Sequence, residues 1–353
     1  MTRIVSYNIL AGGYSMREAG ARRSSQLIKM LRPAQPDVVG LVEAMHPRIK
    51  QTPSVMEEIA EALEMQVVTG GNPKSCKEYP LALLTRLPIV TIKVHECPGI
   101  LARPLLEVCL EEENGEHLTV CLTHLSAAFN RGRAGGALRL RVVAEILRVT
   151  APLRAEGKPH LIMGDFNSLA PMDAFSARSL LRYVVQMNES SLGATYDGHP
   201  DFNAVVPPQL RFLQPLLNLV AGSDMLCSLF DMVAYLYAPR GCIRNLKRLY
   251  VDSYRRVHPY KQGFTCPASA PAGRTDYIFA SPLMTSRLTD CDVLLTGEDD
   301  LTGDQASDHF PLIVEFGLPI TFGATDAVLD VVDNTVPHMV ENAISHVVDN
   351  AIS

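Results

Sequence analysis

Residues 160–171, HLIMGDFNSLAP, join a short apolar run to a polar turn. The apolar residues predict a buried central strand, and the glycine lets the chain turn sharply where that strand ends. The strand delivers Asp165 and Asn167 to an edge of the sheet. Because side chains alternate along an extended backbone, both residues can point to one face. A carboxylate there serves a metal, a proton transfer or a turn, since Asp and Asn are also good turn residues.

Composition limits the class of protein. The 353 residues are 47% apolar, which is enough for one large α/β or all-β domain or for two smaller domains. A net charge of -6 argues against a broad basic surface for duplex DNA, although local Arg or Lys residues and metal ions still bind phosphates. The eight cysteines contain no C-x-x-C pair, which favours buried thiols in a reducing compartment. Since the first residues do not resemble a signal peptide, we expect a cytoplasmic location.

Hydrophobic periodicity predicts alternating strands and helices along most of the chain. Helices are expected at 24–31, 55–63 and 131–149. Strands are expected at 3–10, 37–44, 65–70, 79–86, 89–95, 103–112, 116–126, 274–282, 291–296 and 312–316, in addition to the strand described above. The strands at 103–112 and 116–126 are expected to pair as a hairpin.

Polar residues end, or directly precede, several of these strands. A single such residue is more often a strand terminator, a rim histidine or a turn residue, but so many separate segments indicate a common cause. Carboxylates that meet at one end of a sheet repel each other unless a cation lies among them, which predicts a divalent metal with oxygen ligands. With Mg²⁺ or Mn²⁺, the expected substrate is a phosphate ester. The set comprises Asn8, Glu43, His124, Asp165, Asn167, Asp276, Asp308 and His309.

The motifs SYNIL, LTHL, GDFNS, RTDYIF and SDHFP, together with a Glu after an apolar strand, resemble the endonuclease/exonuclease/phosphatase superfamily. The resemblance spans residues 3–316, with a gap at about 200–248. It implies an α/β fold, a four-layer α/β/β/α sandwich of two mixed β-sheets flanked by helices. It also implies one catalytic domain at 1–320, with a helical insert at about 205–248.

The same resemblance implies roles for individual residues. Glu43 would bind the metal, Asn8 would hold the metal and Glu43 in place, and Asp308 would be a further acidic group near the metal. These roles suit Mg²⁺ or Mn²⁺, which prefer oxygen ligands.

The remaining residues would act on the phosphate. His309, paired with Asp276, would act as general base or stabilise the phosphate, and Asp165 would orient the water or aid the leaving group. Asn167 and His124 would donate hydrogen bonds to the phosphoryl oxygens. An Asp bonded to a His fixes its tautomer and raises its basicity, which agrees with the pairing.

Three positions refine the resemblance. His124 is typical of pancreatic-type deoxyribonucleases and sphingomyelinases, whereas abasic-site endonucleases usually carry Tyr there. Val42 stands where members commonly have Gln, and Thr275 where they commonly have Ile or Leu. Neither departure replaces a group that carries out the chemistry.

Two segments lie outside the motifs. Residues 207–239 are densely apolar but contain Asp224, Ser228 and Asp231 at i, i+4 and i+7, and Gly222 favours two shorter helices over one membrane span. We expect these helices to pack over the main domain, with an active-site lid or a membrane or lipid contact as the alternatives. Residues 240–256 carry basic side chains with Tyr250 and Tyr254 between them, which indicates a solvated helix face or, alternatively, a nucleic-acid contact.

The last residues differ in character from the rest. Residues 330–353 contain three related octads whose apolar positions recur every four residues. This pattern predicts a separate helical tail at 321–353 that packs or self-associates. We expect no obligate protein partner.

These observations support a metal-dependent hydrolase of the phosphodiesterase or nuclease type, acting on nucleic acid or a nucleotide-like diester. A phospholipid phosphodiesterase of the sphingomyelinase kind, or a phosphomonoesterase, is the alternative, favoured by the acidic charge and the apolar insert. A non-catalytic binding protein is disfavoured, because the polar set is complete.

Overall fold

The computed structural model describes residues 1–15, 21–46, 48–70, 80–127, 133–189, 214–238 and 240–318. These residues form two six-stranded sheets. The first sheet has the order β11-β12-β1-β2-β4-β3 and contains β1 (Thr2–Asn8), β2 (Val38–Val42), β3 (Gln66–Gly70), β4 (Leu81–Thr85), β11 (Leu288–Val293) and β12 (Leu312–Phe316). The second sheet has the order β5-β6-β7-β8-β10-β9 and contains β5 (Ile89–His95), β6 (Leu105–Glu111), β7 (His117–His124), β8 (His160–Asp165), β9 (Val251–Asp252) and β10 (Asp276–Ala280).

Both sheets are mixed. β1 runs parallel to β2 and β7 runs parallel to β8, whereas their other neighbours are antiparallel. The predicted hairpin is confirmed, because β6 and β7 pair in antiparallel register from Leu106 opposite Leu122 to Glu111 opposite His117.

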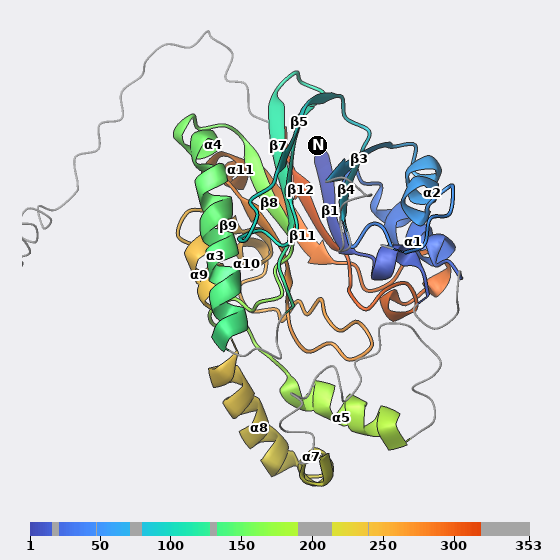
Figure 1. Cartoon of the computed structure of the whole chain (residues 1–353), viewed down its shortest axis with the longest axis vertical. Coiled ribbons are helices and arrows are strands. Elements are labelled where there is room, and N and C mark those ends of the chain that lie inside the picture. Colours follow the sequence, from blue (N-terminus) through green and yellow to red (C-terminus); the bar gives the residue numbers. More distant parts are fainter. Residues whose placement is uncertain are drawn as a thin grey trace, which may run out of the picture. The chain divides into compact units, whose positions relative to one another are not determined.

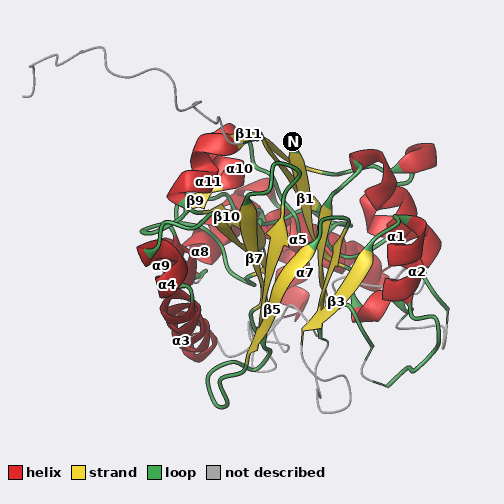
Figure 2. Ribbon diagram, turned by 90° about the horizontal axis from the view of Figure 1, so that it is seen from above, coloured by secondary structure: helices red, strands yellow, loops and turns green. Residues whose placement is uncertain are grey.

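Helices cover the outer faces of the sheets and complete the predicted four layers (Figure 2). α1 (Ser24–Leu31) and α2 (Val55–Ala62) pack on the first sheet. α3 (Arg133–Val149), α4 (Ala151–Ala155) and α9 (Gly241–Leu246) pack on the second sheet. The short helices α10 (Ser253–Val257) and α11 (Pro282–Arg287) lie beside β10.

Burial on both faces explains why the central strands are continuous apolar runs. In β8, Leu161 and Met163 belong to the core between the two sheets, whereas Ile162 packs on the opposite side with α3. In β1, Ile4 and Val5 divide in the same way between the inner core and the layer of α1 and α2. Successive side chains of a strand point to opposite faces, so a strand between two apolar layers needs apolar residues at every position.

The close approach of the neighbouring strand β7 requires a glycine at position 164 of β8. A Cβ at this position would lie 1.9 Å from the carbonyl oxygen of Thr123 in β7, and the residue has a φ of 135°. The glycine therefore permits the close approach of β7 and β8 directly before Asp165.

The apolar insert forms two helices, as the glycine predicts. α7 (Gln214–Ala221) and α8 (Asp224–Tyr237) are separated at Gly222 and Ser223. Their apolar contacts are made with α5 (Ala177–Glu189), a helix that the sequence analysis did not predict. Within the described residues no single helix is long and apolar enough to cross a membrane, and only the α7–α8 pair, bent by 109°, passes such a test together.

The tyrosines of the basic segment are buried, which corrects one expectation. Tyr250 is 3% exposed and Tyr254 is 0% exposed, so neither ring can stack on a nucleic-acid base. Arg255, from the same segment, donates to Asp173 and to nearby carbonyl groups. Tyr250, Tyr254 and Arg255 therefore stabilise the domain. Other basic side chains of the segment are exposed, which agrees with the expected solvated face: Arg244, Lys247, Arg248 and Arg256. The predicted tail at 321–353 lies outside the described residues.

Candidate active site

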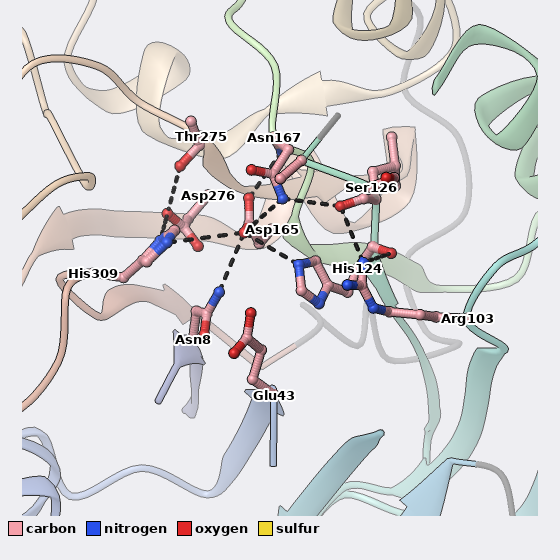
Figure 3. Close-up of polar contacts among 12 residues, drawn as sticks. Asn8, Glu43, Arg103, His124, Ser126, Asp165, Asn167, Thr275, Asp276 and His309 are labelled. Atoms are coloured by element: carbon pink, nitrogen blue, oxygen red, sulfur yellow. Dashed lines mark hydrogen bonds and ion pairs between the residues drawn. The ribbon is translucent and has the colours of Figure 1, made fainter. Parts of the chain in front are cut away.

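The register of three neighbouring strands aligns three of the predicted site residues. His124 at the end of β7 lies opposite Asp165 at the end of β8, and Asp276 at the start of β10 lies opposite Asp165 on its other side. Because neighbouring strands are about 5 Å apart, the sheet itself fixes an imidazole and two carboxylates in a row at one edge. Figure 3 shows these side chains with Asn8, Glu43 and His309, which approach from the first sheet and its loops.

Asp165 is the centre of this arrangement and is 1% exposed. Its Oδ2 accepts hydrogen bonds from Asn8 Nδ2 at 3.2 Å and from Asn167 Nδ2 at 2.9 Å. Its Oδ1 accepts from the backbone N–H of Asn167 at 2.8 Å. His124 Nε2 lies 3.5 Å from the same Oδ2. Burial, followed by the nearby charge of Asp276, raises the pKa of Asp165 to about 7.

Asn167 joins Asp165 by a different route from the one predicted. The strand ends at Asp165, and Asn167 has a left-handed φ of 46°, so the two side chains do not alternate along one extended backbone. The turn folds Asn167 back onto the carboxylate, and its Nδ2 also donates to the carbonyl of Leu125 at 2.9 Å. An asparagine tolerates this backbone conformation better than most residues.

His309 and Asp276 form the predicted pair. His309 Nδ1 lies 2.8 Å from Asp276 Oδ2, and its Nε2 lies 3.9 Å from Asp165 Oδ2. Burial alone would lower the pKa of His309, but the Asp276 carboxylate and other nearby negative groups outweigh it and raise the pKa well above its ordinary value. The imidazole is therefore held as a cation between two carboxylates.

Thr275, one of the departures from the family pattern, also contributes to this pair. Its hydroxyl donates to Asp276 Oδ2 at 3.1 Å, which neither Ile nor Leu can do. Asp276 Oδ1 is buried and has no hydrogen-bond partner among the residues that the structure describes. One oxygen of this carboxylate is thus held by His309 and Thr275, and the other is free to bind a ligand.

Glu43 follows β2 in a left-handed conformation, with a φ of 56°. Such a conformation is costly for a non-glycine residue and is frequent at functional sites. Glu43 Oε2 accepts from the backbone N–H of Ala11 at 2.9 Å, and burial, followed by the charge of Asp308, raises the pKa of Glu43. The amide of Asn8 donates to Asp165, a bond that joins the two sheets, and the role of Asn8 in holding the metal and Glu43 stays a prediction.

Asp308 lies beside these groups. It is half-buried, and burial raises its pKa. Ser307, its neighbour, donates its hydroxyl to the carbonyl of Asn8 at 2.7 Å. This bond ties the loop before β12 to the end of β1, and thereby places Asp308 and His309 at the edge that β1 reaches.

His124 is 6% exposed, and burial lowers its pKa well below the ordinary value. Its Nδ1 has no hydrogen-bond partner within the described ranges. The neutral ring is therefore available to bond a ligand.

Two arginines that the sequence analysis did not assign to the site support His124. Arg103 donates to the carbonyls of His124 and Leu125 at 3.5 and 3.4 Å. Arg139 is 1% exposed and donates to the carbonyls of Ser126 and Ala127, both at 3.0 Å. Arg139 lies on α3, and its side chain faces the loop after β7. No local pattern in the sequence marks either arginine.

The donor set suits a hard divalent cation. Ligand atoms of Asp165, Asp276 and His309 all lie within 4.8 Å of one another, and all three residues are buried. Burial is the main cause that raises the pKa values of Asp165 and Glu43, and a cation bound beside them would favour their ionised forms. Carboxylate and amide oxygens fit Mg²⁺ or Mn²⁺. Since His309 and Asp276 already bond each other, Glu43, Asn8 and Asp308 stay the predicted metal ligands.

The eight predicted site residues therefore lie at the same edge of the two sheets, and Figure 3 labels all of them except Asp308, the neighbour of His309. The protein is therefore an α/β sandwich of two sheets, with a site of carboxylate, amide and imidazole side chains at one edge. The Endonuclease/Exonuclease/phosphatase family model matches residues 5–309, and the chain belongs to this family.

Solved structures of low sequence identity share the fold. An AP endonuclease from Archaeoglobus fulgidus is 16% identical with a TM-score of 0.53, over 90% of this chain and 99% of that chain. The TDP2 of D. rerio, complexed with a single-strand DNA product, is 15% identical with a TM-score of 0.53, over 89% of this chain and 97% of that chain. A protein from Enterococcus faecalis is 14% identical with a TM-score of 0.54, over 89% and 98% of the two chains. A search of curated proteins finds no match.

Proposed function

We propose that this chain is a divalent-metal-dependent phosphoesterase that hydrolyses phosphodiester bonds, with nucleic acid or a nucleotide-like diester as the first candidate substrate. The observation that carries the proposal is the Asp276–His309 pair, with its 2.8 Å contact, beside the buried Asp165. Members of the family act on phosphoester bonds, and two proteins of similar fold are an AP endonuclease and a TDP2 complexed with a single-strand DNA product.

The side chains divide naturally into two groups. His309, held as a cation by Asp276, would bind a phosphoryl oxygen through the Nε2 that faces Asp165. Asp165, with a pKa of about 7, is suited to accept a proton from the attacking water near neutral pH. Asn167 and the neutral His124 would bond the remaining phosphoryl oxygens.

Glu43, Asn8 and Asp308 would hold the metal. A bound Mg²⁺ or Mn²⁺ supplies positive charge that stabilises the negative charge growing on the phosphate. The protein contributes fixed donors, whose positions are set by strand ends and by the loop before β12, which the Ser307 hydroxyl ties to the end of β1.

A phospholipid diester is the second candidate substrate. The observation that favours it is the apolar surface of α8, where Met225 is 77% and Leu236 is 75% exposed. Magnesium as the metal, and the cytoplasm as the compartment, stay predictions.

The test is hydrolysis by the purified full chain of plasmid DNA, oligonucleotides, sphingomyelin vesicles, inositol phosphates and bis(p-nitrophenyl) phosphate, each with Mg²⁺, Mn²⁺ or EDTA. We expect cleavage of diesters that requires the metal and is lost in His309→Ala. His117→Ala is the matched control, because His117 is exposed at the opposite end of β7. Cleavage of lipid alone would overturn the preference for nucleic acid, and activity that resists EDTA would refute the metal.

A further inference from the structure

The outward surface of α8 is apolar, although the helix belongs to a folded domain. Its exposed residues recur at i, i+4, i+7, i+8 and i+11, which places them on one face of the helix. This spacing normally marks the face that a helix buries. Leu216 and Leu219 of α7 are also exposed, at 51% and 63%. The exposed α8 residues are Met225, Leu229, Met232, Val233 and Leu236, at 51–77%.

The two aspartates of α8 form ion pairs with arginines of α5, and the Asp224 side chain remains 89% exposed. Asp231 pairs with Arg178 at 2.6 Å, and Asp224 pairs with Arg182 at 2.5 Å. Arg182 also donates to the carbonyl of Ala221 at the end of α7. These contacts fix both helices on α5 and neutralise the acidic groups that the sequence places on α8. The outward face is left without a charge of its own.

The two helices pack on α5, which lies close along the chain to the candidate active site. α5 begins ten residues after Asn167, and α8 is tied back to the same loop by Arg240, which donates to the carbonyls of Ala170 and Asp173 at 2.5 and 3.0 Å. The guanidinium of Arg240 also lies 4.1 Å from the ring centroid of Tyr235 in α8. Met172, in that loop, is 88% exposed. Figure 1 shows α5, α7 and α8 together, away from the sheets.

We propose that the outward faces of α7 and α8 dock onto the surface of a phospholipid bilayer, with both helices lying in the interface. An uncharged apolar face has no complement for nucleic acid or for a charged protein, but it suits hydrocarbon. The pair has the length and composition of a membrane segment, and its bend of 109° prevents it from crossing as one straight helix. Such helices bury their apolar face about 5–10 Å into the headgroup region.

Docking would bring the phosphoesterase site to a membrane, so this part of the inference rests on the proposed function. The site would then act on a phospholipid headgroup or on a diester held near the surface. Docking itself is measured without turnover, and hydrolysis of bis(p-nitrophenyl) phosphate reports the chemistry without vesicles. A failure of docking and a failure of the proposed function are therefore separate results.

The chain contains no tryptophan, which allows a direct test with a single inserted probe. Leu229→Trp places the probe on α8, and Leu283→Trp is the matched control on α11, because the two leucines are 51% and 49% exposed. With phosphatidylcholine vesicles, we expect the emission of the α8 probe to shift to shorter wavelength and to be quenched by brominated lipid. The control emission should not change.

A second measurement uses flotation with the same vesicles. The variant Leu229→Ser/Met232→Ser/Leu236→Ser should bind at least about tenfold more weakly than the wild type, a difference of about 1.4 kcal/mol. Leu283→Ser should bind as the wild type does. Because the docking face is uncharged, raising the salt concentration should leave binding unchanged.

Three results would overturn the proposal. The first is an emission wavelength of the α8 probe that does not change when vesicles are added. The second is vesicle binding that disappears in high salt. The third is a blue shift that depends on protein concentration without lipid, together with a dimer in light scattering that the serine variant abolishes, which would assign the face to a second copy of this chain.

Discussion

Asp165→Asn should make the metal-free protein more stable at high pH while it abolishes hydrolysis. Burial and Asp276 raise the pKa of Asp165 from 3.8 to about 7 in the folded protein. The folded state therefore binds more protons than the unfolded chain between these two values. Because of this difference, the free energy of unfolding falls as the pH rises through that window. Asparagine removes the titration.

The magnitude follows from the shift. A shift of about three units corresponds to about 4 kcal/mol, and about 1.5 kcal/mol of this is already lost at pH 5. Between about pH 5 and pH 8.5, Asp165→Asn should therefore gain about 2–3 kcal/mol relative to the wild type. Asparagine also loses a hydrogen bond, since both carboxylate oxygens accept from Asn167. That loss is the same at both pH values and cancels from the comparison.

The assay is urea denaturation in EDTA at the two pH values, followed by circular dichroism. Asp290→Asn is the matched control, because Asp290 is an exposed carboxylate on β11. A stability difference between Asp165→Asn and the wild type that does not change with pH would refute the reasoning. Such a result would mean that Asp165 is ionised at little cost in the folded protein.

Three further predictions concern the metal, the phosphate and the sheet. Glu43→Gln should raise the Mg²⁺ concentration needed for half-maximal activity at least about tenfold, whereas Glu116→Gln, on the exposed turn before β7, should not. The same half-maximal Mg²⁺ concentration in both variants would exclude Glu43 as a ligand. His124→Ala should lower kcat roughly 100-fold and leave the far-UV circular dichroism spectrum unchanged, with His117→Ala as the control. An unaltered kcat would show that His124 takes no part in the chemistry. Gly164→Ala should destabilise the protein by about 3 kcal/mol or more, because the new Cβ meets the Thr123 carbonyl; a normal melting temperature would show that β7 and β8 can separate.

The succession of strands along the chain and the approximate positions of their ends were largely predictable from the sequence. A strand buried on both faces must be apolar at each position, so a run such as Leu161–Met163 can be recognised as a strand in the sequence. A polar residue at the end of such a run marks an edge of the sheet. The site followed from these ends. Asp276 and His124 were expected at the same end of a sheet as Asp165 because each lies at the end or the start of a strand, whereas their places opposite Asp165 are known only from the strand register.

Contacts made through bends and long side chains were not predictable in the same way. Asn167 reaches Asp165 through a left-handed turn. A turn was one expectation for this segment, but the sequence did not show that it would fold the Asn167 amide back onto the carboxylate. Arg139 sits on a helix between other charged residues, and its burial depends on a loop that follows a different strand. Thr275 acts through a hydroxyl whose partner is known only once its rotamer is known.

The basic segment and α8 show the limit of patterns based on polarity. Tyr250 and Tyr254 looked available because charged residues surround them, but packing against the sheet buries both rings. In α8 the usual rule is weakened, since both aspartates pair with arginines of α5, whereas two methionines and two leucines are more than half exposed. Only the identity of the neighbouring helix decides which face is covered.

The turn between β6 and β7 lies at the far end of β7 from His124. Glu113 and Asn114 are exposed there, and a Cβ at Gly115 would meet nothing within 4 Å. A peptide epitope or a fluorescent reporter inserted between Glu113 and Asn114 would lie at the end of the domain opposite the candidate active site. The fold thus offers a built-in attachment point for immobilising or labelling the protein while its catalytic edge stays open.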